Sequence, residues 1–305
     1  MSFMGLVILH ALLLPLPTWR ATASNPLVKP GCQARCGDVG IPYPFGVGAG
    51  CFRPGFEIYC HNMTAFLPPD ATVQLGEEPK MSVRVRNITL APRAHVQVSL
   101  QVAHQCFDAA GKEASHYDGR MEVNPLGVYS ISSTANELFV LGCSTFGYYT
   151  AGRGQNSGGC VAYCDTLQST RDDRCAGVGC CRVDIPPGLT NTSMRFGDWP
   201  RSNLTPCNYA FIVEKTHYVF RTDRLRTMPD PHKRWHLPLR LDWAIRHGNK
   251  SMSCVQLTKS PGYSCLSKHS ECVEAHGGPG PGYTCKCANG YQGNRYLDNG
   301  CTGKS

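Results

Sequence analysis

The sequence predicts a mainly β, disulfide-rich protein, with an antiparallel β domain of long bridged loops followed by a small cysteine-bridged module. Three observations support this fold class. The 305 residues include 18 cysteines, which is many for a chain of this length. Glycine and proline number 32 and 22, and no long segment has the 3.6-residue apolar period of a helix. Short segments instead alternate apolar and polar residues, as strands with one buried face do.

The N-terminal residues have the features of a cleaved export signal. An apolar run from Leu6 to Pro17 precedes the small residues Ala21-Thr22-Ala23. A run of about 12 residues is too short to span a bilayer, which needs roughly 20. We expect a signal peptide over residues 1–23 and a secreted, extracellular chain without a transmembrane segment or lipid anchor. A signal-anchor is the alternative, because no positive charge precedes the run.

Asn-x-Ser/Thr sequons are consistent with export. In a secreted protein each is a candidate glycan acceptor and hence a surface position. The five candidates are Asn62, Asn87, Asn191, Asn203 and Asn249.

The charge balance favours anionic partners. Lys and Arg exceed Asp and Glu by 30 to 22, a formal net charge of +8. Outside the cell, such partners are acidic polysaccharides, lipid headgroups or sulfated glycans, and nucleic acid is not expected. A generally basic surface without a partner is the alternative.

Alternation locates the strands. The clearest is His95 to Val102, where valines and Leu100 alternate with polar residues. Ser82 to Arg86 alternates in the same way, but Ile88 and Leu90 fall on the opposite parity. We therefore expect a β-bulge near Arg86-Asn87, which turns Asn87 outward. The other predicted strands are Glu137–Leu141, Tyr209–Val213 and His217–Phe220.

Twelve cysteines lie in a larger domain, which we place at residues 25–247, with a polar boundary near Gly248–Ser253. Cys180 and Cys181 are adjacent, so we expect them to bond separate partners and pin two segments to one point. The pairs Cys32/Cys36 and Cys160/Cys164 loosely fit zinc-ligand spacing, but an oxidising compartment favours disulfides. The twelve are Cys32, Cys36, Cys51, Cys60, Cys106, Cys143, Cys160, Cys164, Cys175, Cys180, Cys181 and Cys207.

The last six cysteines are spaced C-x10-C-x6-C-x12-C-x-C-x13-C, and residues 254–301 resemble an epidermal growth factor-like module. Six cysteines by themselves allow 15 pairings. The resemblance implies the bridges Cys254–Cys272, Cys265–Cys285 and Cys287–Cys301. Calcium-binding modules of this kind carry carboxylates just before the first cysteine, and Asn249–Ser253 has none, so we expect no bound metal.

The larger domain also has recognisable motifs, which are Cys32–Gly46, Gly50–Cys60, Gly179–Pro186, Pro206–Phe211 and Leu239–Trp243, and the module adds Gly290–Leu297. With these motifs the larger domain resembles the galacturonan-binding domain of plant wall-associated receptor kinases. The module resembles the corresponding module of the same family, but has Arg295 where the family usually has proline. The resemblance covers the ectodomain alone, so we expect no kinase, no second calcium-type module, no cofactor and no enzyme activity. Gly-x-Ser-x-Gly and His-Glu-x-x-His motifs are also missing from the sequence.

This resemblance implies binding of pectin, a polymer of galacturonate, in the plant cell wall. An array of Arg and Lys would meet its carboxylates, with Arg favoured for its bidentate fork. Arg84 and Arg86 share a strand face, about 6–7 Å apart. Lys29, Arg35 and Arg53 flank the N-terminal cysteines and complete the candidate set.

A third basic stretch, Lys215 to Arg240, is diluted by acidic residues. Its cations are Lys215, Arg221, Arg224, Arg226, Lys233, Arg234 and Arg240. The aromatic residues Tyr43, Phe45 and Phe56 either stack on sugars or pack beside the cysteines, and packing is favoured.

Two other functions remain open. The growth factor-like module is a candidate to bind a protein partner, either a membrane receptor or a secreted peptide. A defence protein that acts directly on a pathogen is the third possibility.

Overall fold

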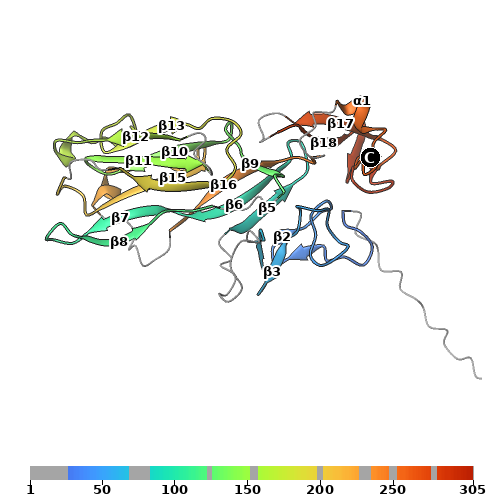
Figure 1. Ribbon diagram of the computed structural model, residues 1–305, viewed down its shortest axis with the longest axis horizontal. Coiled ribbons are helices and arrows are strands. Elements are labelled where there is room, and N and C mark those ends of the chain that lie inside the picture. The colour runs from blue at the N-terminus through green and yellow to red at the C-terminus, as the bar shows by residue number, and fades with distance from the viewer. Residues whose placement is uncertain are drawn as a thin grey trace, which may run out of the picture.

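The computed structural model describes residues 27–68, 83–121, 126–151, 157–197, 202–226, 235–246, 253–275 and 280–304. Within these ranges the elements are almost all antiparallel strands, which confirms the predicted fold class (Figure 1). The predicted signal peptide, Asn249 and the predicted domain boundary lie outside the described residues, apart from Ser253. No helix in the described ranges is long and apolar enough to cross a membrane.

Two facing sheets form the long half of the molecule, on the left in Figure 1. Gly147 brings them close, because a Cβ there would meet the side chains of Val140 and Ala210 in the opposite sheet. The five-stranded sheet has the order β13 (Cys180–Asp184), β10 (Asn136–Leu141), β15 (Cys207–Glu214), β7 (Ala103–Phe107) and β8 (Glu113–Tyr117). The three-stranded sheet consists of β12 (Gly158–Ala162), β11 (Thr145–Ala151) and β14 (Thr192–Phe196).

The central strands β10 and β15 of the five-stranded sheet are buried on both faces. Leu138, Val140 and Ile212 belong to the main core, whereas Phe139 and Phe211 belong to a second core on the opposite face. Burial on both faces explains why β10 and β15 are continuous apolar runs, as predicted at Glu137–Leu141 and Tyr209–Val213.

The prediction of a strand at His217–Phe220 is wrong. The chain turns after β15, with Thr216 at φ 69° and the His217 amide bonded to the Glu214 carbonyl at 3.0 Å. It then folds back over the outer face of the sheet. The Tyr218 ring lies 5.0 Å from both the Phe139 and Phe211 rings. The apparent alternation reflects packing against this sheet, since the segment has no strand partner in the described chain.

A six-stranded sheet extends toward the other end of the molecule. Its order is β3 (Tyr59–His61), β4 (Thr64–Phe66), β5 (Arg84–Thr89), β6 (His95–Gln101), β16 (His236–Trp243) and β9 (Tyr129–Ile131). The predicted strand at His95 is confirmed, with Val96 and Val98 completely buried. The register between β5 and β6 shifts between Val85 and Asn87, which confirms the predicted bulge.

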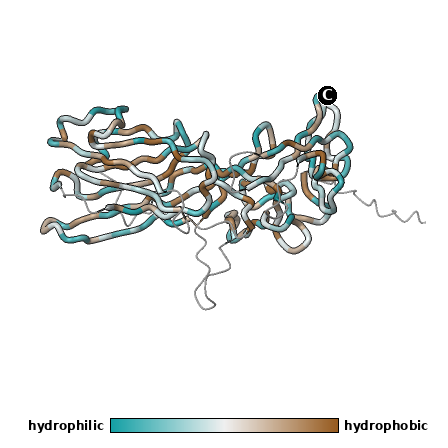
Figure 2. The backbone as a smooth tube through the Cα atoms, turned by 45° about the horizontal axis from the view of Figure 1, so that its top comes forward, coloured by the Kyte–Doolittle hydropathy of each residue, from teal (hydrophilic) through white to brown (hydrophobic). Residues whose placement is uncertain are grey.

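The strands of the two larger sheets are linked in the chain. β6 leads directly into β7 through the buried Val102, so one run of residues passes from the six-stranded to the five-stranded sheet. In Figure 2 hydrophobic residues lie along the strands of the long half, and hydrophilic residues are prominent in the loops at its far end.

The growth factor-like module packs against the end of β16. Its elements are α1 (Cys254–Leu257), β17 (Ser270–Ala275), β18 (Gly282–Cys287), β19 (Tyr291–Gly293) and β20 (Cys301–Gly303). Ile245 and Tyr283 exchange two main-chain hydrogen bonds of 2.8 and 2.9 Å, so the module continues the β pairing of the larger domain.

An aromatic cluster joins the module to the N-terminal segment, which contains the hairpin β1 (Arg35–Cys36) and β2 (Val39–Gly40). The Trp243 ring centroid lies 5.3 Å from those of Phe45 and Phe56 and 5.8 Å from that of Tyr296. With Tyr43 also buried, the three aromatic residues considered for sugar stacking are packing residues, as the favoured interpretation held.

All eighteen cysteines form nine disulfides, so the pairs considered for zinc are disulfide-bonded. The three bridges of the module are those that the resemblance implied. Cys180 bonds Cys175 and Cys181 bonds Cys160, which confirms that the adjacent cysteines reach separate partners.

Candidate functional site

Arg84 and Arg86 line one hollow at the outer part of the six-stranded sheet. Their strand, β5, lies close to β2 in Figure 1. We call this hollow the arginine hollow. Its volume is about 440 Å³. Both arginines are exposed, and the intervening Val85 is buried in the core. The lining residues are Cys36, Asp38, Val39, Met63, Thr64, Ala65, Arg84, Val85, Arg86 and Gln97.

The hollow exists because strands β4 and β5 stop pairing. They share a single registered pair, Phe66 with Arg84. The residues beyond that pair line a common space instead of continuing the ladder, and the bulge at Arg86 interrupts β5 on the same side.

The turn between β1 and β2 closes the far side. Gly37 lies against Met63 there with φ 56°, and a Cβ at Gly37 would come within 2.1 Å of the Met63 carbonyl oxygen. Only glycine fits this approach.

The two arginines carry charge that the described residues do not neutralise. Neither guanidinium has an ion pair or hydrogen bond to any described residue. The Asp38 carboxylate is the acidic group in the lining, and the Asp38 carbonyl accepts a bond of 2.7 Å from Arg35. Because the guanidinium groups of Arg84 and Arg86 have no partner among the described residues, they can bind the carboxylate of an external ligand.

The third basic stretch differs, because several of its cations have acidic partners. Lys215 pairs with Asp184 at 2.8 Å and Arg221 with Asp172 at 3.4 Å, while Arg240 pairs with Glu214. The Asp172 pKa is lowered, chiefly by the Thr222 main-chain amide and further by Arg221. Lys215 likewise lowers the pKa of Asp184. Lys233 and Arg234 lie outside the described residues.

The other three predicted residues do not join the arginine hollow as lining residues. Lys29 lies over the Tyr43 ring, 4.6 Å from its centroid, and donates to the Gly50 carbonyl. Arg53 donates to the Gly262 carbonyl of the module at 3.0 Å. Arg35 reaches only the Asp38 carbonyl at the edge of the hollow. The structure therefore brings Arg84 and Arg86 together, with Arg35 nearby.

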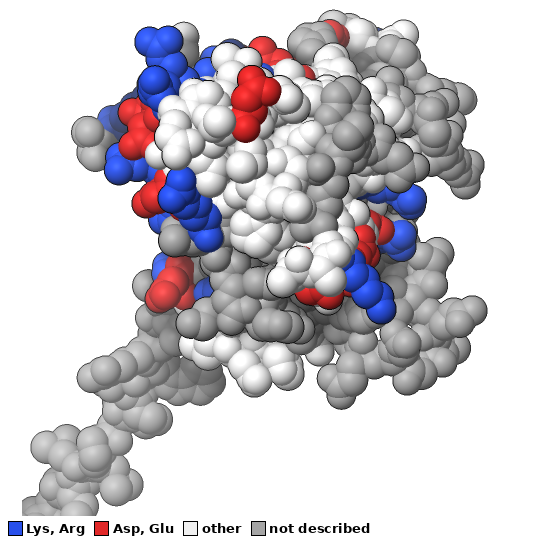
Figure 3. All heavy atoms as spheres, turned by 90° about the vertical axis from the view of Figure 1, so that its left-hand side faces the viewer, with Lys and Arg blue, Asp and Glu red and all other residues white. Residues whose placement is uncertain are grey.

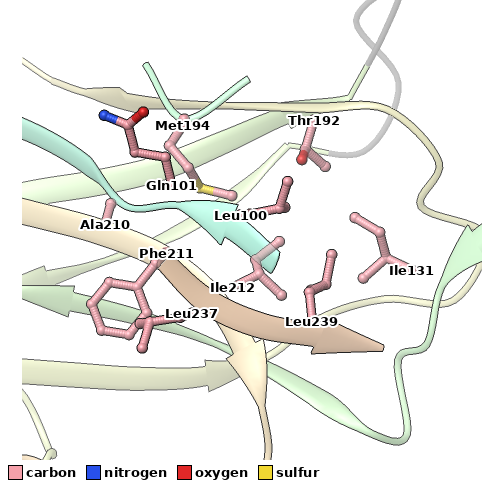
Figure 4. A pocket seen from close by; sticks show the side chains of 11 residues that line it. Leu100, Gln101, Ile131, Thr192, Met194, Ala210, Phe211, Ile212, Leu237 and Leu239 are labelled. Carbon is pink, nitrogen blue, oxygen red and sulfur yellow. The ribbon is translucent and has the colours of Figure 1, made fainter. Parts of the chain in front are cut away.

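Two other spaces suit a ligand less well. A cavity of about 10 Å³ between the sheets is lined mainly by apolar side chains such as Leu100, Ile131 and Leu239, and has room for one water at most (Figure 4). A groove of about 450 Å³ separates the module from the larger domain, but its arginines, Arg53 and Arg246, already donate to main-chain carbonyls.

The far end of the long half carries mixed charge. In Figure 3, Lys and Arg lie beside Asp and Glu around a largely uncharged centre. Among the coloured residues, this end therefore presents no single basic field. No group of three or more potential metal ligands occurs in the described part of the chain.

Sequence reasoning missed the aromatic residues next to the arginine hollow. Tyr59 and His61 lie on β3, and Phe66 lies on β4. Their strands are three residues long, too short for a period to be recognised. The available signal is Cys60, whose disulfide to Cys36 holds that position toward the core and turns its neighbours outward.

Two predicted glycan acceptors lie beside the hollow. Asn62 is exposed in the turn between β3 and β4, and the exposed Asn87 directly follows Arg86. Asn191 and Asn203 lie elsewhere, next to β14 and before β15.

Comparison with known proteins connects this site to a family. Residues 32–99 match the family described as wall-associated receptor kinase galacturonan-binding, and this range contains every lining residue of the arginine hollow. No solved structure matches the chain.

The chain is also similar to several receptor kinases of Arabidopsis thaliana. It is 32% identical to wall-associated receptor kinase 2, over 88% of this chain and 34% of that protein. Identity is 30% to wall-associated receptor kinase 4, over 89% of this chain and 34% of that protein, and 29% to wall-associated receptor kinase 1, over 90% and 35%. The chain spans about a third of the length of these relatives. The chain is thus similar to the wall-associated receptor kinases over nearly its whole length, and its residues 32–99 match the galacturonan-binding family model.

Proposed function

We propose that this chain binds acidic pectin through the arginine hollow, either as a cell-wall-sensing ectodomain or as a secreted relative of the receptors. The proposal rests on one observation. Two exposed arginines without a described acidic partner line a hollow that lies wholly inside the galacturonan-binding family match. The proposal includes a secreted location at the cell wall, where de-esterified pectin supplies the carboxylates.

The chemistry of the hollow suits a uronate polymer. Arg84 and Arg86 are two residues apart on a strand, so their Cα atoms are separated by about 6–7 Å. Each guanidinium presents a planar fork that can donate two parallel hydrogen bonds to one carboxylate. The volume of about 440 Å³ is within the range of small-ligand sites, roughly 300–1,000 Å³.

The test is direct binding of the purified, glycosylated chain to galacturonate oligomers, with and without methyl esters, across a salt series. We expect binding that weakens with methylation and with salt, because both reduce the charge attraction. The variant Arg84→Gln/Arg86→Gln should lose about tenfold or more in affinity for the de-esterified oligomer, since a charge-assisted hydrogen bond contributes about 1.5–3 kcal/mol.

Arg93→Gln is the matched control. Arg93 is exposed and lies within residues 32–99, but it does not line the hollow. An equal loss in this variant would indicate a general charge effect. Failure of the folded wild-type chain to bind any galacturonan would refute the proposal.

A protein partner is the second candidate function. The growth factor-like module exposes apolar side chains, and Val255 is 73% exposed on α1. Isolated exposed valines are common, but Leu266 and Val273 of the same module are also exposed. This candidate predicts binding to a receptor or secreted peptide that is indifferent to pectin esterification and sensitive to Val255→Asp.

A further inference from the structure

We infer that Tyr59, His61 and Phe66 form a sugar-stacking surface that continues the arginine hollow. We call it the aromatic platform. It would bind the apolar ring faces of the same uronate units whose carboxylates reach Arg84 and Arg86. The inference rests on the proposed function and adds a second recognition element to it. This element contacts the face of the sugar ring, whereas the arginines bind its carboxylate.

The strand register places Tyr59, Phe66 and Arg84 in one row, and His61 lies two residues along β3 on the same face as Tyr59. Tyr59 is opposite Phe66, and Phe66 is opposite Arg84, on three neighbouring antiparallel strands. Directly opposed residues project from the same face of a sheet. Ala65 and Val85 alternate with them and are buried in the core, so the row lies on the outer face.

The row ends where the sheet becomes covered. The next partner of Arg84 is Ser99 on β6, which is buried. The accessible row is therefore three strands wide. Neighbouring strands are about 4.7–4.9 Å apart, so the row extends about 10 Å from Tyr59 to Arg84. Those dimensions suit a short stretch of polymer lying across the strands.

The rings of Tyr59 and His61 are exposed and nearly parallel, and Phe66 is half-buried. Tyr59 is 44% exposed, and its ring is nearly parallel to that of His61, with an interplanar angle of 10° and centroids 6.3 Å apart. β3 is the edge strand of its sheet, so no further strand covers this side in the described structure. The Cys36–Cys60 disulfide fixes the residue between the two rings and thereby holds both outward.

Sugars of the galacto configuration carry several C–H bonds on one ring face, and such a face stacks on an aromatic ring. This contact does not involve the carboxylate charge, so methylation of the carboxylate leaves the contact unchanged. A ligand that spans the platform and the hollow therefore meets two elements with different responses to salt. Loss of the platform should lower affinity by the same factor at every salt concentration, whereas loss of the arginines should reduce the salt dependence.

The experiment compares Tyr59→Ala with Tyr59→Phe and Arg84→Gln/Arg86→Gln in the complete glycosylated chain. Titration calorimetry with de-esterified galacturonate oligomers, at low and high salt, gives the affinities. We expect Tyr59→Ala to bind about five- to tenfold more weakly at both salt concentrations. Tyr59→Phe should bind like the wild type, because the ring is retained. Tyr163→Ala is the matched control, since Tyr163 is 50% exposed but lies in the long half.

The outcomes separate the two proposals. If Tyr59→Ala binds like the wild type while the arginine variant is defective, the platform is wrong and the arginine hollow stands. If the wild type binds no galacturonan, the proposed function fails and the platform fails with it. A change in oligomeric state on Tyr59→Ala, measured by light scattering, with unchanged affinity would assign the exposed rings to self-association and would also overturn the inference.

Discussion

The side-chain amide of Asn294 donates a hydrogen bond of 2.7 Å to the main-chain carbonyl of Tyr43, which lies 251 residues earlier in the chain. The same amide donates to the Leu27 carbonyl at 2.7 Å, and its oxygen accepts from the Tyr296 amide at 3.0 Å. Asn294 is completely buried. One side chain thus satisfies three main-chain groups where the module meets the N-terminal segment.

Asn294→Ala should destabilise the protein by about 1–3 kcal/mol, because it leaves the buried Tyr43 carbonyl without its donor, whereas the Leu27 carbonyl still accepts from the Tyr43 amide at 2.9 Å. Chemical denaturation of the purified variant measures the loss. Asn289→Ala is the control, since Asn289 is exposed in the same module. Equal stabilities of the two variants would show that the contact contributes little.

The disulfides should differ in their contribution according to the loop that each closes. Cys106–Cys207 closes 101 residues and Cys175–Cys180 closes 5. In the chain-entropy account these contribute about 4.7 and about 2 kcal/mol. Replacing each pair by serine and comparing the free energies of unfolding tests the order. A larger loss for the Cys175–Cys180 pair would contradict it.

Asp242 should make stability depend on pH in an unusual direction for a carboxylate. Burial raises its pKa above the ordinary value, against lowering contributions from Ser132, His95, Arg240 and Arg93. The folded state therefore holds the proton more tightly than the unfolded chain. This contribution to stability is complete below the unfolded pKa and is lost as pH rises through the raised value.

Asp242→Asn imitates the protonated form. The variant should be more stable than the wild type at neutral pH, and the difference should shrink as the pH falls through the raised pKa. Melting curves of both proteins, in a background with His95→Gln that removes the imidazole opposite Asp242, give the difference. A difference that grows on acidification would contradict the assignment.

Glycans at Asn62 and Asn87 should restrict access to the arginine hollow, because both acceptors flank it. Removing them should tighten binding of long galacturonate oligomers more than of short ones. Asn62→Gly is the suitable change at the first site, because Asn62 has φ 46°, which glycine adopts freely. At the second site, Asn87→Gln removes the acceptor, and Asn203→Gln, in the long half, is the control. Equal affinities in all variants would place the glycans clear of the ligand.

The sequence predicted elements whose pattern reflects one buried face. The alternation at Val96 and Val98 located β6, and the change of parity after Arg86 located the bulge. The bridges of the module came from family resemblance and not from spacing, which allows many pairings. The prediction of a strand at His217–Phe220 was wrong because alternation also arises where a segment folds back and packs on a sheet.

The candidate site was predictable only in part. Arg84 and Arg86 share a hollow because β4 and β5 part there, and no local pattern encodes that event. Which cations are neutralised depends on partners distant in sequence, such as Asp172 for Arg221. The row from Tyr59 to Arg84 follows from cross-strand register, which a single sequence does not give.

The junction of the module also has a mechanical consequence. Main-chain bonds between Ile245 and Tyr283 and the contacts of Asn294 fasten the module to β16 and to the N-terminal segment. The module therefore cannot reorient relative to β16 without breaking these hydrogen bonds. A pull on the module loads β16, which is paired to β6, which in turn is paired to β5. Tension applied at one end of the molecule is thus delivered, two strands away, to the strand that carries Arg84 and Arg86.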